Sequence, residues 1–418
     1  MHTIEILRVV CRMLTAALSF CYLYQIVYLF VPLFQKRRAH GPEKKTRYAI
    51  LIAARNEEAV LPYLLDSIAA QNYPAELVTT YVVADNCTDR TAEVAARLGA
   101  RVYRRFNRTE IGKGYALRYL LDRIHESGEY ENYDAFLVFD ADNLLRSNYL
   151  TEINRTCSDG YEAFCGYRNS KNYSDNWISA GYALWFLHEC VHLNQARMLL
   201  GTTCAVSGTG FGFTRALLDR CGGWHFFTLT EDNEFNTWCA TRGARIGYCP
   251  GAILYDEQPS SFRQSWRQRT RWVQGGMQIA RRCSWDMLCG MARGGRTGYA
   301  SFEMATLSFW GYVVSFAVMA LTLTTTVLWA GWAMLPQFLL ESLLGAYGSL
   351  WAVGLLTTVS EWKRIDAGTS QKILYLFTFP LFMMTYIPIT ISALFRKFQW
   401  QPIAHTVAVP VGRMASGE

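Results

Sequence analysis

The chain has 418 residues, which predicts about two or three domains rather than a single core. Hydrophobic residues make up 51% of it and charged residues only 18%, against about 25% in soluble proteins, so the composition favours membrane segments. The net charge of +7 suits anionic lipid headgroups or phosphorylated substrates and does not favour a nucleic-acid partner. The twelve cysteines form no CxxC pair and no zinc spacing, so we expect reduced thiols.

The first apolar stretch, from about Val9 to Leu33, is long enough to cross a bilayer and predicts a transmembrane helix within residues 1–35. A cleaved signal peptide is the alternative, which the absence of a small-residue cleavage pattern disfavours. A basic cluster follows the stretch and consists of Lys36, Arg37, Arg38, Lys44, Lys45 and Arg47. The positive-inside rule then predicts that the domain after this cluster lies in the cytoplasm, and with the later apolar stretches we expect a multi-pass protein of the cell membrane.

Residues 46–260 alternate short apolar strands with helical segments, which predicts an α/β domain built on a parallel sheet. Strands at 48–54, 78–84 and 136–139 each run into polar or acidic residues. The residues at these strand ends are Ala54, Arg55, Glu57, Asp85, Asp140 and Asp142. Because such sheets bind ligands at the carboxyl ends of their strands, we expect these residues to surround a nucleotide-type ligand.

Asp140 and Asp142 are two residues apart and would share a face on an ideal strand. Paired carboxylates of this kind hold Mg²⁺ or Mn²⁺ together with a substrate's phosphates. The simpler interpretation is a strand that ends in a solvated turn. The spacing does not suit a glycosidase, which needs two carboxyl groups on either side of the scissile bond.

Two later segments carry further candidates. The small residues around Gly208 would let a sugar or a pyrophosphate approach the backbone, although a tight turn explains them equally well. At Thr230-Glu231-Asp232 a helix is expected to begin. Thr230 suits its cap, the acidic residues suit its first turn, and Asp232 in a cleft would act as a general base.

Residues 261–300 are expected to form an amphipathic helix at the membrane interface. Helical spacing places Gln268, Arg271 and Trp272 on one face, and Arg269 also lies near Trp272. Arginine beside tryptophan suits phosphate binding combined with sugar stacking.

The C-terminal region, residues 301–398, is expected to hold the remaining membrane helices, before a tail at 399–418. Two spans are predicted at Met304–Leu328 and Phe338–Val359. A third apolar stretch, Ile373–Phe395, either crosses the membrane or is kinked and re-entrant, because it contains two prolines and has basic residues at both ends.

Together these segments resemble the membrane-embedded family 2 glycosyltransferases, the branch that includes cellulose, chitin, hyaluronan and poly-N-acetylglucosamine synthases and ceramide glucosyltransferase. The resemblance covers about Tyr48 to Gln278. It rests on the order and separation of motifs that stand here as Asp85, Asp140-Ala-Asp142, Thr230-Glu-Asp232 and Gln268-Arg-Thr-Arg271-Trp272, with further matches at 53–57 and Gly112-Lys113-Gly114.

The resemblance implies an A-type, Rossmann-like glycosyltransferase fold, a UDP-sugar donor, inversion at the anomeric carbon, and Mg²⁺ or Mn²⁺ as cofactor. Asp85 would contact the uracil or ribose, Lys113 the nucleotide, and Asp140 the ribose or diphosphate. Asp142, with Asp140, would hold the metal. Asp232, beside Glu231, would be the catalytic base. The remaining substrate-binding candidates are Ala54, Arg55, Glu57, Gly208, Gln268, Arg269, Arg271 and Trp272.

The function expected first is processive extension of a glycan chain in a membrane-bound polysaccharide synthase. Transfer of a single sugar to a lipid acceptor is the alternative, which the few spans and the interfacial basic helix suit. The small membrane portion and the Gly208-Thr209 turn differ from those of several polymer synthases and weaken the case for a long polymer. A transport protein with a degenerate nucleotide-binding domain is a third hypothesis, but the predicted spans hold few ionisable residues for a relay.

Overall fold

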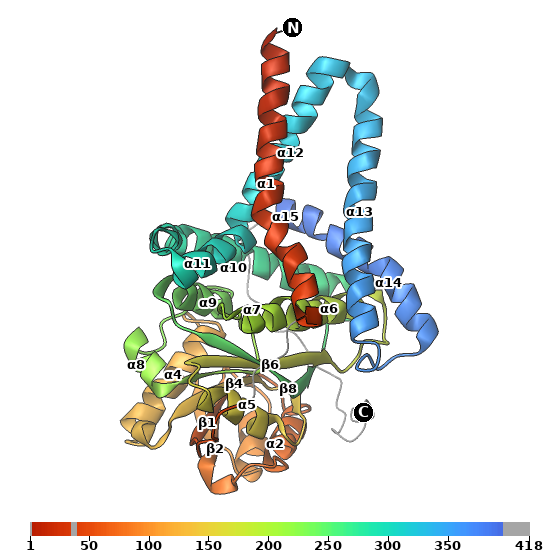
Figure 1. Ribbon diagram of the computed structural model, residues 1–418. Helices are drawn as coiled ribbons and strands as arrows, with labels where there is room; N and C mark the ends of the chain where they lie inside the picture. Colours follow the sequence, from red (N-terminus) through yellow and green to blue (C-terminus); the bar gives the residue numbers. More distant parts are fainter. Residues whose placement is uncertain (1, 35–39, 396–418) are drawn as a thin grey trace.

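The computed structural model describes residues 2–34 and 40–395; the expected tail at 399–418 and the basic residues 36–38 lie outside these ranges. An eight-stranded sheet forms the centre of the lower half of the molecule, and long helices extend from it (Figure 1). The strands are β1 (Tyr48–Ala54), β2 (Val78–Asp85), β3 (Arg101–Arg105), β4 (Ala135–Asp140), β5 (Leu144–Leu145), β6 (Ala163–Ser170), β7 (Phe211–Thr214) and β8 (Ile246–Asp256).

The strand order is β3-β2-β1-β4-β7-β6-β8-β5. Strands β3, β2, β1 and β4 run parallel, whereas β7 is antiparallel to both of its neighbours. In this register Ala53 lies opposite Val83 on one side and Asp140 on the other. The carboxyl ends of β1, β2 and β4 therefore meet at one edge of the sheet, as expected for an α/β domain.

Alternate residues of β1 enter two separate cores, which explains why this strand is apolar on both faces. Leu51 belongs to the same core as Leu117 of helix α4, whereas Ile50 belongs to the core that includes Leu64 of α2 and Ile153 of α5. The α-helices of this half are α2 (Leu61–Ala69), α3 (Thr91–Arg97), α4 (Lys113–Glu126), α5 (Tyr149–Ser158), α6 (Trp177–His188), α7 (Gln195–Leu200), α8 (Arg215–Cys221) and α9 (Glu231–Arg242). A π-helical turn, η3 (Glu189–Asn194), lies between α6 and α7. Two 3₁₀ turns, η1 (Ala75–Leu77) and η2 (Tyr130–Asn132), complete the set.

Three long helices, α1 (His2–Phe34), α12 (Phe309–Ala330) and α13 (Leu335–Ser360), project away from the sheet (Figure 1). The 3₁₀ turn η4 (Trp332–Met334) connects the last two. With the C-terminal segment 369–395 they are the helices of the described chain that are long and apolar enough to cross a membrane. The apolar run predicted to start at Met304 is divided, because α11 (Gly295–Leu307) ends before Ser308, whose hydroxyl accepts from the N–H of Trp310 and caps α12.

The C-terminal segment differs from the other three. It is interrupted at Thr385 between α14 (Thr369–Met384) and α15 (Tyr386–Phe395), and both parts stay close to the sheet domain (Figure 1). About 33% of its apolar window is buried, against 6–11% for the other three. Beneath it runs the long helix α10 (Phe262–Ala292). The segment is thus bent, as one of the two alternatives from the sequence expected.

Candidate active site

A cavity of about 1120 Å³ extends from the carboxyl edge of the sheet to the four apolar segments α1, α12, α13 and 369–395, called the membrane-type helices below. It is lined by residues that are far apart in sequence but were expected in one site. These are Ala54, Arg55, Glu57, Asp85, Lys113, Asp140, Gly208, Glu231, Asp232, Gln268, Arg271 and Trp272. Two of the expected site residues, Asp142 and Arg269, are not part of this lining.

At the sheet edge, Asp85 forms a buried ion pair with Arg105, whose Nη1 lies 2.7 Å from Asp85 Oδ1. Asn86 donates to the same oxygen at 3.1 Å and holds a left-handed backbone with φ of 55°. One carboxylate oxygen is therefore occupied by protein donors. The motif analysis did not identify Arg105, because it lies on the next strand, β3, and belongs to none of the motifs.

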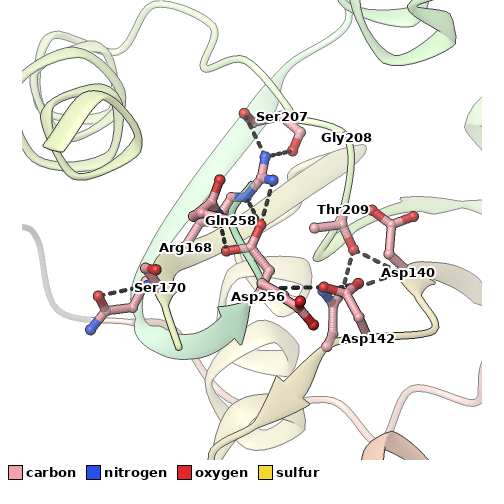
Figure 2. Close-up of polar contacts among 12 residues, drawn as sticks. Asp140, Asp142, Arg168, Ser170, Ser207, Gly208, Thr209, Asp256 and Gln258 are labelled. Carbon is pink, nitrogen blue, oxygen red and sulfur yellow. Dashed lines mark hydrogen bonds and ion pairs between the residues drawn. The ribbon is translucent and has the colours of Figure 1, made fainter. Parts of the chain in front are cut away.

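Lys113 joins two segments of the cavity wall. Its Nζ lies 2.5 Å from Asp140 Oδ1 and donates to the carbonyl oxygen of Gly208 at 2.7 Å. The N–H of Asp140 donates to Thr209 Oγ1 at 2.9 Å (Figure 2). The end of β4, the start of α4 and the glycine-rich turn are thus held together. The Asp140 side chain remains 39% exposed and faces the cavity.

Asp142 is placed differently from Asp140. It is buried, its Oδ2 accepts the N–H of Glu257 at 2.9 Å, and its carbonyl oxygen accepts from Lys171. Strand β4 ends at Asp140 and a turn follows, so the alternation that would place both carboxylates on one face stops there. The expectation that the two side chains face the ligand together is not met in this structure.

These carboxylates were expected to hold a metal ion. Among the described residues, no group of three or more His, Cys, Asp or Glu side chains is arranged to do so. Mg²⁺, however, is often held by one or two carboxylates together with substrate phosphates. The exposed carboxylate of Asp140 fits that pattern as a single protein ligand, whereas the buried Asp142 does not in its present position.

Glu231 and Asp232 begin helix α9, and both line the cavity. Burial, and then the charge of Asp232, raise the pKa of Glu231 to about 7, and burial also raises the pKa of Asp232. Gly208 approaches closely, since a Cβ there would lie 3.7 Å from Asp232 Oδ2 and the backbone has φ of +75°. A buried carboxylate of raised pKa is well suited to accept a proton from a bound hydroxyl.

Three of the motif residues of helix α10, Gln268, Arg271 and Trp272, line the cavity, whereas Arg269 does not. Arg271 lines the cavity and donates to the carbonyl oxygen of Leu229 at 2.7 Å. Gln268, one turn earlier, also lines the cavity, and its buried Oε1 has no hydrogen-bond partner within residues 2–34 and 40–395. The ring of Trp272 packs edge-on against Tyr182 at 5.7 Å. The face of α10 expected from helical spacing does face the cavity.

Arg269 is fully buried on the other side of α10. Its Nη1 donates to Thr385 Oγ1 at 2.7 Å and to the carbonyl oxygen of Phe382 at 3.0 Å, and its guanidinium lies 4.3 Å from the Phe382 ring centroid. Two residues along a helix rotate the side chain by about 200°, so Arg269 and Arg271 point apart. Arg269 anchors the α14–α15 bend instead of lining the expected substrate site.

Arg168 of β6 lines the cavity but was not identified from the sequence. Its Nε donates to Asp256 Oδ2 at 2.7 Å and its Nη1 to the carbonyl oxygen of Ser207 at 2.8 Å (Figure 2). The guanidinium also lies 3.6 Å from the Phe186 ring centroid. Its carboxylate partner is 88 residues away in the chain, so no local pattern marked it.

Comparisons with known proteins agree with this architecture. The probable glycosyltransferase YdaM of Bacillus subtilis is 26% identical over 242 residues, 56% of each chain. A β-monoglucosyldiacylglycerol synthase of Nostoc sp. is 28% identical over 267 residues, 57% of this chain and 54% of the relative. A poly-β-1,6-N-acetyl-D-glucosamine synthase of Staphylococcus epidermidis is 23% identical over 291 residues, 67% of this chain and 66% of the relative. The chain thus spans only about half the length of the first two.

Among solved structures, a mannosyltransferase of Pyrobaculum calidifontis in complex with GDP-Man and Mn²⁺ is similar with a TM-score of 0.53 and 17% identity. The similarity covers 92% of this chain and 99% of the mannosyltransferase. At this identity the match concerns the fold, and it confirms the expected A-type glycosyltransferase architecture. The family model described as glycosyltransferase like family 2 matches residues 46–275, more than half of the chain, so the protein belongs to glycosyltransferase family 2.

Proposed function

We propose that the protein transfers a sugar from a UDP-sugar to a hydroxyl group of an acceptor that enters from the membrane, with inversion at the anomeric carbon. The observation that carries this proposal is the single cavity that includes both the sheet edge, with Asp85 and Asp140, and the pair Glu231–Asp232. The same cavity continues between the membrane-type helices.

The nucleotide would lie along the carboxyl ends of β1, β2 and β4. Asp85, with the Ala54–Glu57 segment, would contact the base and ribose, and Asp140 and Lys113 the ribose and diphosphate. Arg271 lines the cavity and the diphosphate would pair with its guanidinium, which is well shaped to bind phosphate oxygens. Mg²⁺ or Mn²⁺, bound by Asp140 and the diphosphate, would supply additional neutralisation of the leaving group.

In the transfer step the acceptor oxygen attacks the anomeric carbon while the bond from that carbon to the diphosphate oxygen breaks. The electron pair of that bond leaves with UDP, whose charge Lys113 and Arg271 stabilise. Asp232 accepts the proton of the attacking hydroxyl, which its raised pKa favours. One direct displacement inverts the configuration and needs no enzyme nucleophile.

The acceptor end of the cavity favours a lipid. Its walls between the membrane-type helices are mainly apolar and include Leu307, Phe309, Phe316, Leu350, Val353, Phe379, Met383 and Ile387. Apolar walls suit acyl or prenyl chains better than a hydrated glycan. The similarity to a β-monoglucosyldiacylglycerol synthase is consistent with this choice. Transfer of one sugar to a lipid thus moves ahead of glycan extension, which the sequence had favoured.

Glycan extension remains the second candidate because of the aromatic side chains near the reacting end. Trp185, Trp266 and Trp272 line the cavity there, and indole rings stack on sugar faces. The similarity to a poly-β-1,6-N-acetyl-D-glucosamine synthase supports this candidate. Membership in a glycosyltransferase family favours both over a transport function.

We further propose that α1, α12 and α13 cross the cell membrane with the sheet domain in the cytoplasm. The four apolar helices have the required length, and the basic residues Lys44, Lys45 and Arg47 lie between α1 and the domain. Positive charge beside a span favours the cytoplasmic side. The bent α14–α15 segment would lie at the same interface.

The test is to incubate the purified full-length protein in phospholipid nanodiscs with Mn²⁺ and a panel of donors: UDP-glucose, UDP-galactose, UDP-N-acetylglucosamine and GDP-mannose. Dioleoylglycerol and cello- or chito-oligosaccharides serve as acceptors, and the products are identified by mass. One hexose increment on the lipid is the expected result, and a ladder of oligomers would support the second candidate. If no donor is consumed with any acceptor, the proposal is wrong.

A further inference from the structure

One wall of the cavity, near Asp232, has no part in the transfer step described above. It is formed by the end of α6 and the start of the π-helical turn, where Trp185, His188 and Glu189 line the cavity. A π-helical turn shifts the side-chain positions of a helix and is frequent at functional sites.

Glu189 presents a carboxylate near the proposed base. Its Oε2 accepts a hydrogen bond from the hydroxyl of Ser207 at 3.0 Å, and Ser207 precedes Gly208, where a Cβ atom would lie 3.7 Å from Asp232 Oδ2. Within the described part of the chain, no hydrogen bond to Glu189 Oε1 is found. Burial raises the pKa of Glu189, while the charge of Arg197, the hydrogen bond from Ser207 and the charge of Arg168 lower it, and the charge of Asp232 makes a smaller contribution that raises it.

His188 supplies a second polar group. It is only 7% exposed, it lines the cavity, and its Nδ1 has no hydrogen-bond partner among the described residues. Burial lowers the pKa of His188 to about 3, so the ring is neutral at physiological pH. A neutral imidazole offers one N–H donor and one acceptor nitrogen. A buried polar atom without a partner is an exception in folded proteins, and a bound group, an ordered water or an ion would supply the missing partner of His188.

The two arginines of this wall are already paired. Arg168 pairs with Asp256, and Arg197 is held by Glu303 at 2.8 Å. The wall thus presents the carboxylates Glu189 and Asp232 together with a neutral imidazole, while its guanidinium groups are compensated. A phosphate group placed here would face like charges, whereas a hydroxyl group would find acceptors for its proton.

We propose that His188 and Glu189 form an acceptor subsite that binds a neutral, hydroxyl-bearing group and directs one hydroxyl towards Asp232. This inference rests on the proposed function, which it narrows: the reacting end of the acceptor is a polyol, such as a glycerol backbone or a sugar ring, and not a phosphate such as that of a polyprenyl phosphate. Trp185 forms the aromatic side of the same subsite.

The experiment uses the full-length protein in nanodiscs with the donor that the panel identifies. Dioleoylglycerol and undecaprenyl phosphate are the two acceptor probes. The variants are Glu189→Ala, the conservative Glu189→Gln, and His188→Ala. Glu126→Gln is the control, because Glu126 lies on the surface of α4 in an exposed pair with Arg123. KM is measured for donor and acceptor separately, with UDP release in the absence of acceptor and UDP binding by calorimetry.

We expect transfer to dioleoylglycerol and none to undecaprenyl phosphate. Glu189→Ala should raise the acceptor KM about tenfold to hundredfold, because a charged hydrogen-bond acceptor is lost, and Glu189→Gln should partly restore it. The donor KM, acceptor-free UDP release and UDP affinity should stay within about twofold in both variants.

Efficient transfer to undecaprenyl phosphate would overturn the inference, and so would equal losses of donor and acceptor affinity in Glu189→Ala with unchanged thermal stability. His188→Ala keeps the test decisive if Glu189→Ala fails to fold, since a raised acceptor KM supports the subsite and an unchanged one contradicts it. Donor consumption without these acceptor effects refutes the subsite alone, whereas no consumption of any donor refutes the proposed function with it.

Discussion

Two acidic pairs, Asp140–Asp142 and Glu231–Asp232, were expected in one site, and the structure uses them in different ways. In the first pair only Asp140 faces the cavity, where Lys113 compensates its charge, while Asp142 binds a backbone N–H in the interior. In the second pair both carboxylates line the cavity, and burial raises the pKa of each. The comparison indicates that surroundings, more than spacing in the sequence, decide which carboxylate holds charge and which accepts a proton.

The largest effect is expected for the second pair. Asp232→Asn removes the proposed proton acceptor and should lower kcat by about 10²- to 10⁴-fold, with the donor KM nearly unchanged. The measurement is UDP release at saturating donor and acceptor. The control is Glu126→Gln on the exposed surface of α4, which should retain full activity. Activity within tenfold of the wild type would remove Asp232 from the mechanism.

The second-largest loss of activity is expected for Lys113, whose ammonium group lies beside Asp140. Lys113→Met leaves Asp140 without its partner and the diphosphate without a compensating charge, so kcat/KM for the donor should fall about 10- to 100-fold. Arg118→Gln is a matched control, because Arg118 lies on the exposed side of the same helix. A double variant with Asp140→Asn should lose less than the two single losses combined. Additive losses would mean that the two side chains act independently.

Several parts of this comparison follow from the sequence. The strands that end at Asp85 and Asp140 are apolar runs closed by acids, and parallel pairing brings their ends together. In a helix, a step of two residues turns the side chain by more than half a revolution, so Arg271 and Arg269 point in different directions. The sequence analysis nevertheless assigned both arginines to the substrate site. Strand ends and helix faces repeat regularly along the chain, so local patterns are sufficient to detect them.

Other parts depend on contacts that no local pattern encodes. Arg168 is held by Asp256 from another strand, and Arg105 reaches Asp85 from β3. The turn after β4 directs Asp142 into the interior. This turn leads into β5, which pairs with the distant strand β8, so the sequence around Asp142 does not predict it. The π-helical turn at Glu189 has no composition signal either. These features come from tertiary packing, which selects among conformations that the local sequence allows equally.

A third prediction concerns the pH dependence of folding stability, to which the raised pKa of Glu231 contributes. In the folded protein the pKa of Glu231 is raised from 4.5 to about 7, so between these values the folded state binds more protons than the unfolded state. The contribution of Glu231 to stability is therefore present below about pH 4.5 and is lost as the pH rises to about 7, by up to about 3 kcal/mol. Glu231→Gln should flatten the pH dependence of the thermal midpoint between pH 5 and 8. The same slope in the variant and the wild type would show that Glu231 is already ionised at pH 5.

The smallest effect on activity is expected for Asp142, and it separates the two members of the first pair. Asp140→Asn should raise the Mn²⁺ concentration needed for half-maximal activity about tenfold or more, because its carboxylate faces the diphosphate. Asp142→Asn should shift that concentration less than about threefold, and it should instead lower the free energy of unfolding by about 1–3 kcal/mol, since the charged acceptor of the Glu257 N–H is lost. Mn²⁺ titrations and thermal unfolding of both variants measure the two quantities. An equal shift in both titrations would mean that the turn after β4 rearranges when the donor binds and brings Asp142 to the metal, as the sequence motif alone had suggested.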